Sequence, residues 1–173
     1  MRDQTRIAAG LLCGLWLAAG SLPAQTQQIP PSYQEVLNYL ARTGDYKDNV
    51  LKVNIPRNDI KVSIDGIATP TPFGFGGWLA MTKGRAGTEV MMGDLVLTQD
   101  EVNPVMSALL DHGLEVTALH NHFFWEEPRL YYMHVHGMGK PADLAREAKP
   151  ALDLIGHVLV DGHHVQPVAA EGF

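Results

Sequence analysis

The stretch Ala118-Leu-His-Asn-His-Phe-Phe-Trp-Glu-Glu-Pro-Arg-Leu-Tyr-Tyr-Met-His-Val-His136 holds four of the eight histidines of the chain, as two His-x-His pairs. Residues 116–122 and 130–136 are rich in aliphatic and aromatic side chains, which predicts two strands. Side chains two positions apart on a strand point to the same face of a sheet. We therefore expect the two histidines of each pair to share one face.

Imidazoles that converge from neighbouring strands form either a metal site or an acid/base cluster. The candidate metal ligands are His120, His122, His134 and His136. Zinc takes imidazole nitrogen and carboxylate oxygen in tetrahedral geometry, and copper or nickel accepts the same ligands. Glu126 or Glu127 is the candidate fourth ligand, or the general base that would let metal-bound water carry out a hydrolysis.

The register of the hairpin decides how many histidines meet. If the hairpin is tight, His120 lies opposite Tyr132, and His134 stands on the diagonal within reach of one ion. If the connecting residues form a long loop, His122 faces His134 and His120 faces His136, so that all four converge. The sequence leaves both registers open.

The alternative hypothesis is a binding module without chemistry, which holds a small or anionic ligand. Aromatic side chains would line an apolar pocket, and the histidines and Arg129 would orient the ligand. The aromatic residues in this hypothesis are Phe73, Phe75, Phe124, Trp125 and Tyr132. The histidines would then be packed, hydrogen-bonded groups and not metal ligands.

The size and composition of the chain favour a single globular domain. Its 173 residues are enough for one core and too few for two ordinary domains. Hydrophobic residues make up 46% and charged residues 18% of the chain, as in globular proteins. The formal net charge of −6 argues against a nucleic-acid binder, because such proteins usually carry a basic patch. We expect a metal ion or a small molecule as the partner.

The first 24 residues have the layout of a secretory signal. Arg2 and Arg6 lie beside an apolar run over 7–19, and Ser21-Leu-Pro-Ala24 offers a cleavage site. The run is short for a transmembrane span, so we expect export to the periplasm or the medium and no stable span in the processed chain. Cys13, the only cysteine, lies inside the run and not at the cleavage point, which argues against a lipid anchor.

Strands and helices alternate along the rest of the chain. The sequence predicts an α+β fold, with a mostly antiparallel sheet and two or three helices on one face. A polar tether over 25–31 precedes the single domain of 32–162, and a polar tail follows over 163–173.

Capping boxes predict one helix from Ser32 to about Gly44 and another that follows Thr98 and ends at Gly113. In the second of these helices, Pro104 predicts a kinked first turn or a start at Asn103. A third helix is expected from Pro141 to Gly156.

The remaining segments predict hairpins. Runs 50–55 and 60–64 are expected to pair and to end at the Asp65-Gly66 turn. Residues 67–77 are expected to form a loop, and 78–82 is expected to pair with 88–98 around a bulge at Gly93. Val158–Val160 would close the sheet. Met91, Met92, Met133 and Met138 are potential soft-metal ligands, but we expect them to be core filler, the usual role of methionine.

Several of these motifs resemble the LppY/LpqO family of exported bacterial proteins, a domain of unknown function. They are Pro56-Arg-Asn-Asp-Ile-Lys-Val-Ser-Ile-Asp-Gly66, Gly93-Asp-Leu-Val-Leu-Thr98, Glu101-Val-Asn-Pro-Val-Met106 and Val116-Thr-Ala-Leu-His-Asn-His122. The similarity continues through Glu126-Glu-Pro-Arg129 and Met133-His134 and covers about residues 34–156. It implies secretion or lipid anchoring and brings no established activity. Position 136 is commonly aromatic in the family, so His136 departs from its pattern.

Overall fold

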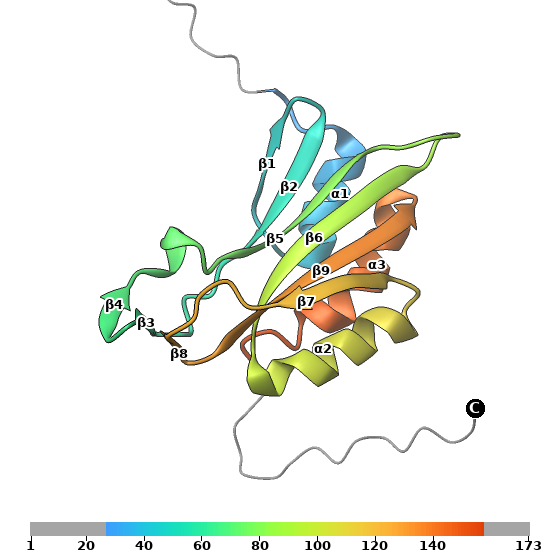
Figure 1. The fold of residues 1–173 in the computed structure, drawn as a ribbon. Coiled ribbons are helices and arrows are strands. Elements are labelled where there is room, and N and C mark those ends of the chain that lie inside the picture. Colours follow the sequence, from blue (N-terminus) through green and yellow to red (C-terminus); the bar gives the residue numbers. More distant parts are fainter. Residues whose placement is uncertain (1–26, 158–173) are drawn as a thin grey trace, which may run out of the picture.

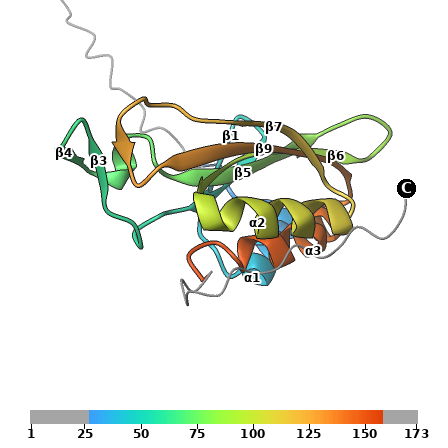
Figure 2. The ribbon, with the colours of Figure 1, turned by 60° about the horizontal axis from the view of Figure 1, so that its bottom comes forward.

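The computed structural model describes residues 27–157. The predicted signal segment, the strand over 158–160 and the tail lie outside these residues. Three helices, α1 (Pro31–Leu40), α2 (Gln99–Asp111) and α3 (Pro141–Leu152), lie on one face of a large sheet (Figure 1, Figure 2). The structure confirms the predicted class, a single α+β domain with an antiparallel sheet.

The large sheet, sheet A, has six antiparallel strands in the order β1-β2-β5-β6-β9-β7. Their bounds are β1 Gly44–Lys47, β2 Val50–Ile55, β5 Gly77–Lys83, β6 Glu89–Thr98, β9 Leu130–Gly139 and β7 Glu115–His120. The two ten-residue strands β6 and β9 pair along their full length in the middle of the sheet. The helices cover one face of sheet A, and we call the opposite face the open face.

A small sheet, sheet B, lies at one end of sheet A (Figure 1). It consists of β4 (Ile67–Thr69), β3 (Val62–Ile64) and β8 (Glu126–Glu127), in that order. The connection between β2 and β5 contributes β3, β4 and a short 3-10 helix, η1 (Thr71–Phe73), and the connection between β7 and β9 contributes β8. Two insertions that are distant in sequence therefore form one lobe.

The predicted pairing of 50–55 with 60–64 is wrong, because these strands belong to different sheets. Arg57 explains the departure. This residue is 2% exposed, and its guanidinium donates to Glu101 at the start of α2, to Asp59 and to the Val96 carbonyl oxygen. The chain is thereby anchored beside α2 instead of turning back along β2. The Asp65-Gly66 turn does form, and it joins β3 to β4 with both residues at positive φ, as a type I′ turn requires.

Other boundaries also differ from the predictions. Helix α1 begins at Pro31, which is pre-organised for the first helical position, so the expected capping box at Ser32 is not used. Helix α2 starts directly after Thr98, whose amide donates to Glu101 at 2.7 Å in the predicted capping box, and it includes Pro104. Helix α3 ends at Leu152, before the expected stop. Part of the predicted loop 67–77 forms β4 and η1.

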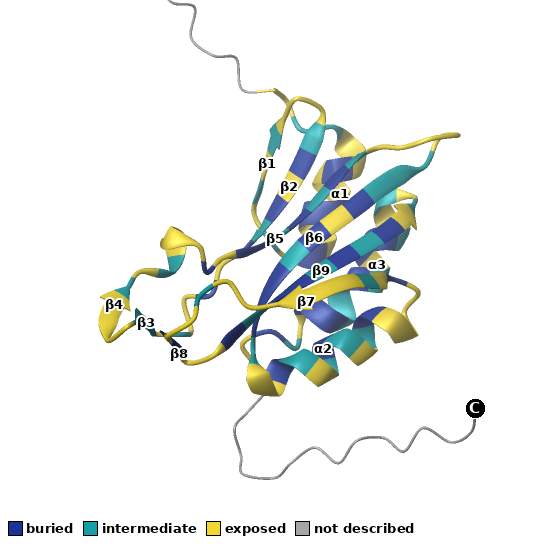
Figure 3. Ribbon diagram, in the orientation of Figure 1, coloured by how far each residue is buried: buried dark blue, intermediate teal, exposed yellow. Residues whose placement is uncertain are grey.

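The domain has two hydrophobic cores. The larger core fills the space between sheet A and the helices, with fully buried side chains such as Leu51, Leu95, Leu109 and Leu144. The smaller core lies between sheet B and the end of the open face, and its buried residues are Val62, Phe75, Val96, Leu130 and Tyr132. Along β2 and β5 of sheet A, buried residues alternate with less buried ones (Figure 3). In the described part of the chain, no helix is long and apolar enough to cross a membrane.

Candidate functional site

The register of β7 and β9 places histidines from both predicted pairs together on the open face. His120 lies opposite Tyr132, as the tight hairpin predicts, and Ala118 lies opposite His134. The Nε2 atoms of His120 and His134 are 2.8 Å apart, a hydrogen-bond distance, and their ring centroids are 5.0 Å apart. One ring must donate and the other accept, so this bond requires at least one neutral imidazole.

His122 joins this pair from the loop after β7. Its ring stacks on Tyr132 with centroids 3.4 Å apart and lies 5.1 Å from the ring of His120. Tyr132 is buried beneath it and donates its hydroxyl to the Gly74 carbonyl oxygen at 3.0 Å. The buried Tyr132 ring therefore supports the imidazoles from below and is held in place by its hydrogen bond. Burial is the main reason that the pKa of the Tyr132 hydroxyl is raised.

Asp94 completes the same face from β6, where it is the direct partner of His134. Its Oδ1 is buried and has no hydrogen-bond partner among the described residues. We did not predict this residue from the sequence. The regular two-residue period of β6 places this lone carboxylate on the face shared by Val90, Met92 and Val96, but the bulge expected at Gly93 would have broken that period.

The two glutamates of the predicted site point to opposite sides of β8. Glu126 is 5% exposed, and its Oε1 accepts the Leu130 amide at 3.1 Å. Its Oε2 is buried and lacks a partner within residues 27–157. Glu127 is exposed. The structure thus brings Glu126 towards the histidines and turns Glu127 away from them, as the pleat of a strand requires.

We call His120, His122, His134, Asp94 and Glu126 the histidine cluster. The other members of the cluster act electrostatically on His122, and the pKa of its imidazole is lowered. Partial burial is the largest cause, and the neighbouring His120 and His134 act in the same direction. The negative charges of Asp94 and Glu126 act in the opposite direction. The cluster therefore combines three imidazoles with two carboxylates close enough to influence one of them.

The other predicted site residues lie outside this cluster. His136 is on the same face, two residues beyond His134 on β9, and its Nδ1 contacts Glu115 Oε2 at 3.0 Å. Arg129 is exposed, and Phe124 and Trp125, in the β7–β8 loop, are 80% and 72% exposed. Of the other two aromatic residues, Phe75 is buried in the smaller core and Phe73 is exposed. The predicted five-residue aromatic pocket is therefore not formed, because its members divide between core and surface.

The cluster is not arranged around a single point as it stands. Among residues 27–157, no group of three or more His, Cys, Asp or Glu side chains is positioned to hold a metal ion. Two nitrogens on one tetrahedral zinc ion lie roughly 3.4 Å apart, given bond lengths of about 2.0–2.1 Å. The hydrogen bond between His120 and His134 is shorter than that. An ion at this position would replace the bond and push the rings slightly apart.

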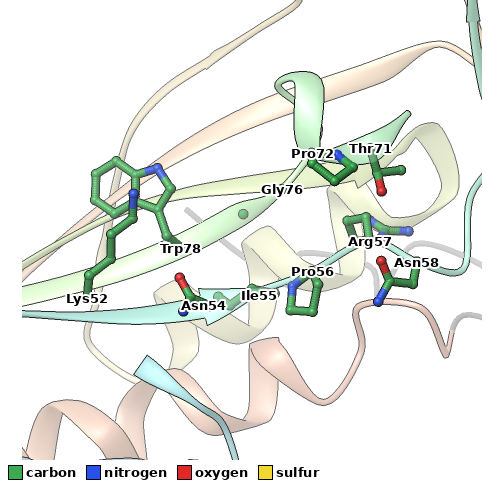
Figure 4. Close-up of a pocket in the computed structure, with 11 residues that line it drawn as sticks. Lys52, Asn54, Ile55, Pro56, Arg57, Asn58, Thr71, Pro72, Gly76 and Trp78 are labelled. Atoms are coloured by element: carbon green, nitrogen blue, oxygen red, sulfur yellow. The ribbon is translucent and has the colours of Figure 1, made fainter. Parts of the chain in front are cut away.

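A pocket of 270 Å³ lies beside the cluster, at the ends of β2 and β5 (Figure 4). Lys52, Asn54 and Trp78 form one side of it, and the ammonium group of Lys52 sits 5.0 Å from the centre of the Trp78 ring. Trp78 is the cross-strand partner of Asp94. The pocket and the cluster therefore occupy neighbouring positions on one face.

Comparison with known proteins identifies a family and no characterised relative. A family model described as Domain of Unknown Function (DUF1259) matches residues 34–154, which include most of α1, all of α2 and α3, both sheets and the whole histidine cluster. No curated protein and no solved structure matches the chain.

Proposed function

The chain belongs to the family of the Domain of Unknown Function (DUF1259), and from the site it carries we propose that the histidine cluster binds a divalent metal ion, with zinc as the best match. The observation that carries the proposal is the pair of buried carboxylate oxygens, Asp94 Oδ1 and Glu126 Oε2, that lack partners among the described residues. A buried carboxylate is costly unless a proton, a donor or a cation compensates it.

The composition of the cluster supports this assignment. Imidazole nitrogen and carboxylate oxygen are the ligands that zinc takes in sites without cysteine, and copper and nickel accept them too. His120 and His134 would provide two ligands, and Asp94 stands directly opposite His134. The ion would supply the missing partner of a buried carboxylate and replace the hydrogen bond between the two imidazoles.

Zinc titration of the untagged protein by calorimetry tests this proposal. We expect about one ion per chain, and affinity reduced by more than about tenfold in Asp94→Asn and lost in a His120→Ala, His134→Ala double variant. His112→Ala is the matched control, because His112 is an exposed histidine at the end of α2. Metal analysis after growth with zinc, copper and nickel provides a second measurement. Absence of stoichiometric metal in both experiments would refute the proposal.

Hydrolysis is the chemistry that such a site would support. Glu126 is the buried carboxylate beside the imidazoles and would act as general base for a metal-bound water. Glu126→Gln keeps the shape of the side chain and removes the base. We expect this variant to lose any turnover of activated carboxylic or phosphate esters by the wild-type protein, while retaining at least part of its zinc affinity. Equal turnover in both proteins would exclude Glu126 as the base.

A binding module without metal is the second candidate. It is favoured by the hydrogen bond between His120 and His134, which satisfies the two rings without an ion. In that case the double variant stays folded and loses the thermal stabilisation given by a small anion, with inorganic phosphate and acetate as the first probes. Stabilisation of the wild-type protein by zinc and not by these anions would decide for the metal site.

We also propose that the chain is exported, on the basis of the N-terminal sequence alone. Cleavage after Ala24 leaves Gln25 as the first residue. Intact mass measurement on the protein from a periplasmic or culture fraction tests this position. Recovery of the protein only from the cytoplasm, with the first 24 residues retained, would contradict it.

A further inference from the structure

The six methionines of the described residues differ widely in exposure, and Met106 is intermediate. Met81, Met91 and Met133 are at most 1% exposed in the larger core, which is the role expected for methionine. Met92 and Met138 are 56% and 58% exposed. More than half of each of these two side chains is exposed to water, so the expectation that Met92 and Met138 are core filler is wrong, and we looked for another role for them.

Both exposed methionines flank His136 on the open face. Met92 on β6 is the direct cross-strand partner of His136, and Met138 lies two positions beyond His136 on β9. Opposite side chains have Cβ atoms about 4.5–5.5 Å apart, and diagonal ones about 7–8 Å. Methionine has three rotatable side-chain bonds. Two sulfur atoms and one imidazole nitrogen can therefore converge on one point above the sheet.

Glu115 prepares His136 for ligation. Its Oε2 lies 3.0 Å from His136 Nδ1, and a carboxylate can only accept in this contact. In the neutral imidazole the hydrogen therefore resides on Nδ1, and Nε2 keeps its lone pair for a metal ion. A carboxylate on the second ring nitrogen is the usual outer partner of a metal-binding histidine, because it fixes the tautomer and the orientation of the ring.

We propose that Met92, His136 and Met138 form a binding site for a soft monovalent metal ion, Cu(I), with Glu115 as the positioning residue. Thioether sulfur is a soft ligand that selects Cu(I), whereas zinc prefers imidazole, thiolate and carboxylate. The ligand set is neutral and needs no proton release from the thioethers. The site is separate from the histidine cluster, since His136 bonds to Glu115 and not to the other histidines, and it does not rest on the proposed zinc function.

Anaerobic titration with Cu(I), in competition with a chromophoric copper chelator, tests the proposal on the full chain. A Met92→Leu, Met138→Leu double variant conserves side-chain volume on an exposed surface, so we expect it to fold normally. Its Cu(I) affinity should fall by more than about tenfold, the loss typical of disturbing even an outer partner of a metal site. Met106→Leu, which removes a thioether from α2, should leave the affinity unchanged.

X-ray absorption of the copper complex identifies the ligands directly. We expect sulfur scattering that disappears in the double methionine variant, and nitrogen scattering that is reduced in His136→Ala. The methionine variant should bind zinc as the wild type does. An unchanged Cu(I) affinity in the methionine variant would overturn the proposal. Loss of Cu(I) binding in the His120→Ala, His134→Ala double variant, with both methionines intact, would also overturn it, because copper would then occupy the histidine cluster.

Discussion

At the scale of single residues, the buried ion pair of Arg57 and Glu101 is the most consequential contact outside the candidate sites. The two side chains are 2% and 3% exposed and are joined at 2.7 and 3.0 Å. Removal of one partner of a buried pair leaves the other charge uncompensated and costs about 3–5 kcal/mol. We therefore expect Arg57→Met to lower the free energy of unfolding by about that amount, as measured by urea denaturation.

Lys149→Met is the control for this prediction. Lys149 pairs with Asp153 at 2.7 Å on the surface of α3, with 34% and 56% of the two side chains exposed. Surface pairs of this kind contribute about 0–1 kcal/mol, so the loss should be small. Similar losses of unfolding free energy in both variants would show that the burial of Arg57 does not increase the contribution of its ion pair.

Asp59 gives the same network a dependence on pH. The hydrogen bond from Arg57 is the largest reason that its pKa is lowered in the folded protein. A lowered folded-state pKa stabilises the fold above the unfolded value of about 3.9, and this contribution disappears as the pH falls through the folded value. The difference in unfolding free energy between wild type and Asp59→Asn should thus be constant near neutral pH and shrink below about pH 4. A difference that grows on acidification would contradict this sign.

The histidine cluster shows which residues of a site can be predicted from sequence. Alternation along two strands was sufficient to predict that His120 and His134 meet, and the structure confirms it at 2.8 Å. Asp94 was missed because its partner is set by long-range pairing of β6 with β9, which the local pattern does not encode. The choice between Glu126 and Glu127 depended on the pairing of β8 with β3, which is equally distant in sequence.

At the scale of elements, Gly93 explains how β6 packs against its neighbours without the predicted bulge. The strand pairs regularly through Gly93 with both β5 and β9. A Cβ at this position would overlap Leu79 Cδ2 and lie 3.2 Å from the Trp78 carbonyl oxygen. The apparent break in the hydrophobic pattern therefore marks a place where glycine makes room for Leu79, and Met91 occupies the core beside it.

We expect Gly93→Ala to destabilise the protein by about 1–3 kcal/mol, the usual cost of overpacking a core. Gly76→Ala is the matched control, because a Cβ there would meet no atom within 4 Å. That change should be neutral or slightly stabilising, since alanine restricts the unfolded chain. Thermal unfolding of both variants checks the difference. Equal unfolding temperatures would show that the strands shift to accept the methyl group.

Local pattern predicted the helices and the strands of sheet A better than it predicted their partners. Strand β2 was placed correctly at Val50–Ile55, and its expected partner was wrong because the anchored Arg57 separates it from β3. Strand β1 was missed, since Gly44 was expected to end the first helix. A Cβ at Gly44 would lie 2.6 Å from the Lys52 carbonyl oxygen, so this glycine permits the close pairing of β1 with β2.

At the scale of the whole molecule, the larger core holds the fold together and the smaller core supports the histidine cluster. The larger core holds the helices against sheet A, on the face opposite the histidine cluster. The smaller core includes Tyr132, on which His122 stacks, and it lies under sheet B, which carries Glu126. The positions of His122 and Glu126 in the cluster therefore depend on the packing of the lobe formed by the two insertions.

This division predicts different outcomes for cavities in the two cores. Phe75→Ala in the smaller core should cost about 3–5 kcal/mol and Leu109→Ala in the larger core about 2–5 kcal/mol, because both side chains are fully buried. Only Phe75→Ala should also weaken the proposed zinc binding, since its cavity loosens Tyr132 and sheet B beneath the imidazoles. Calorimetry well below the unfolding temperature of both variants checks this. If both lose zinc affinity equally, the cluster depends on the stability of the whole domain and not on the lobe.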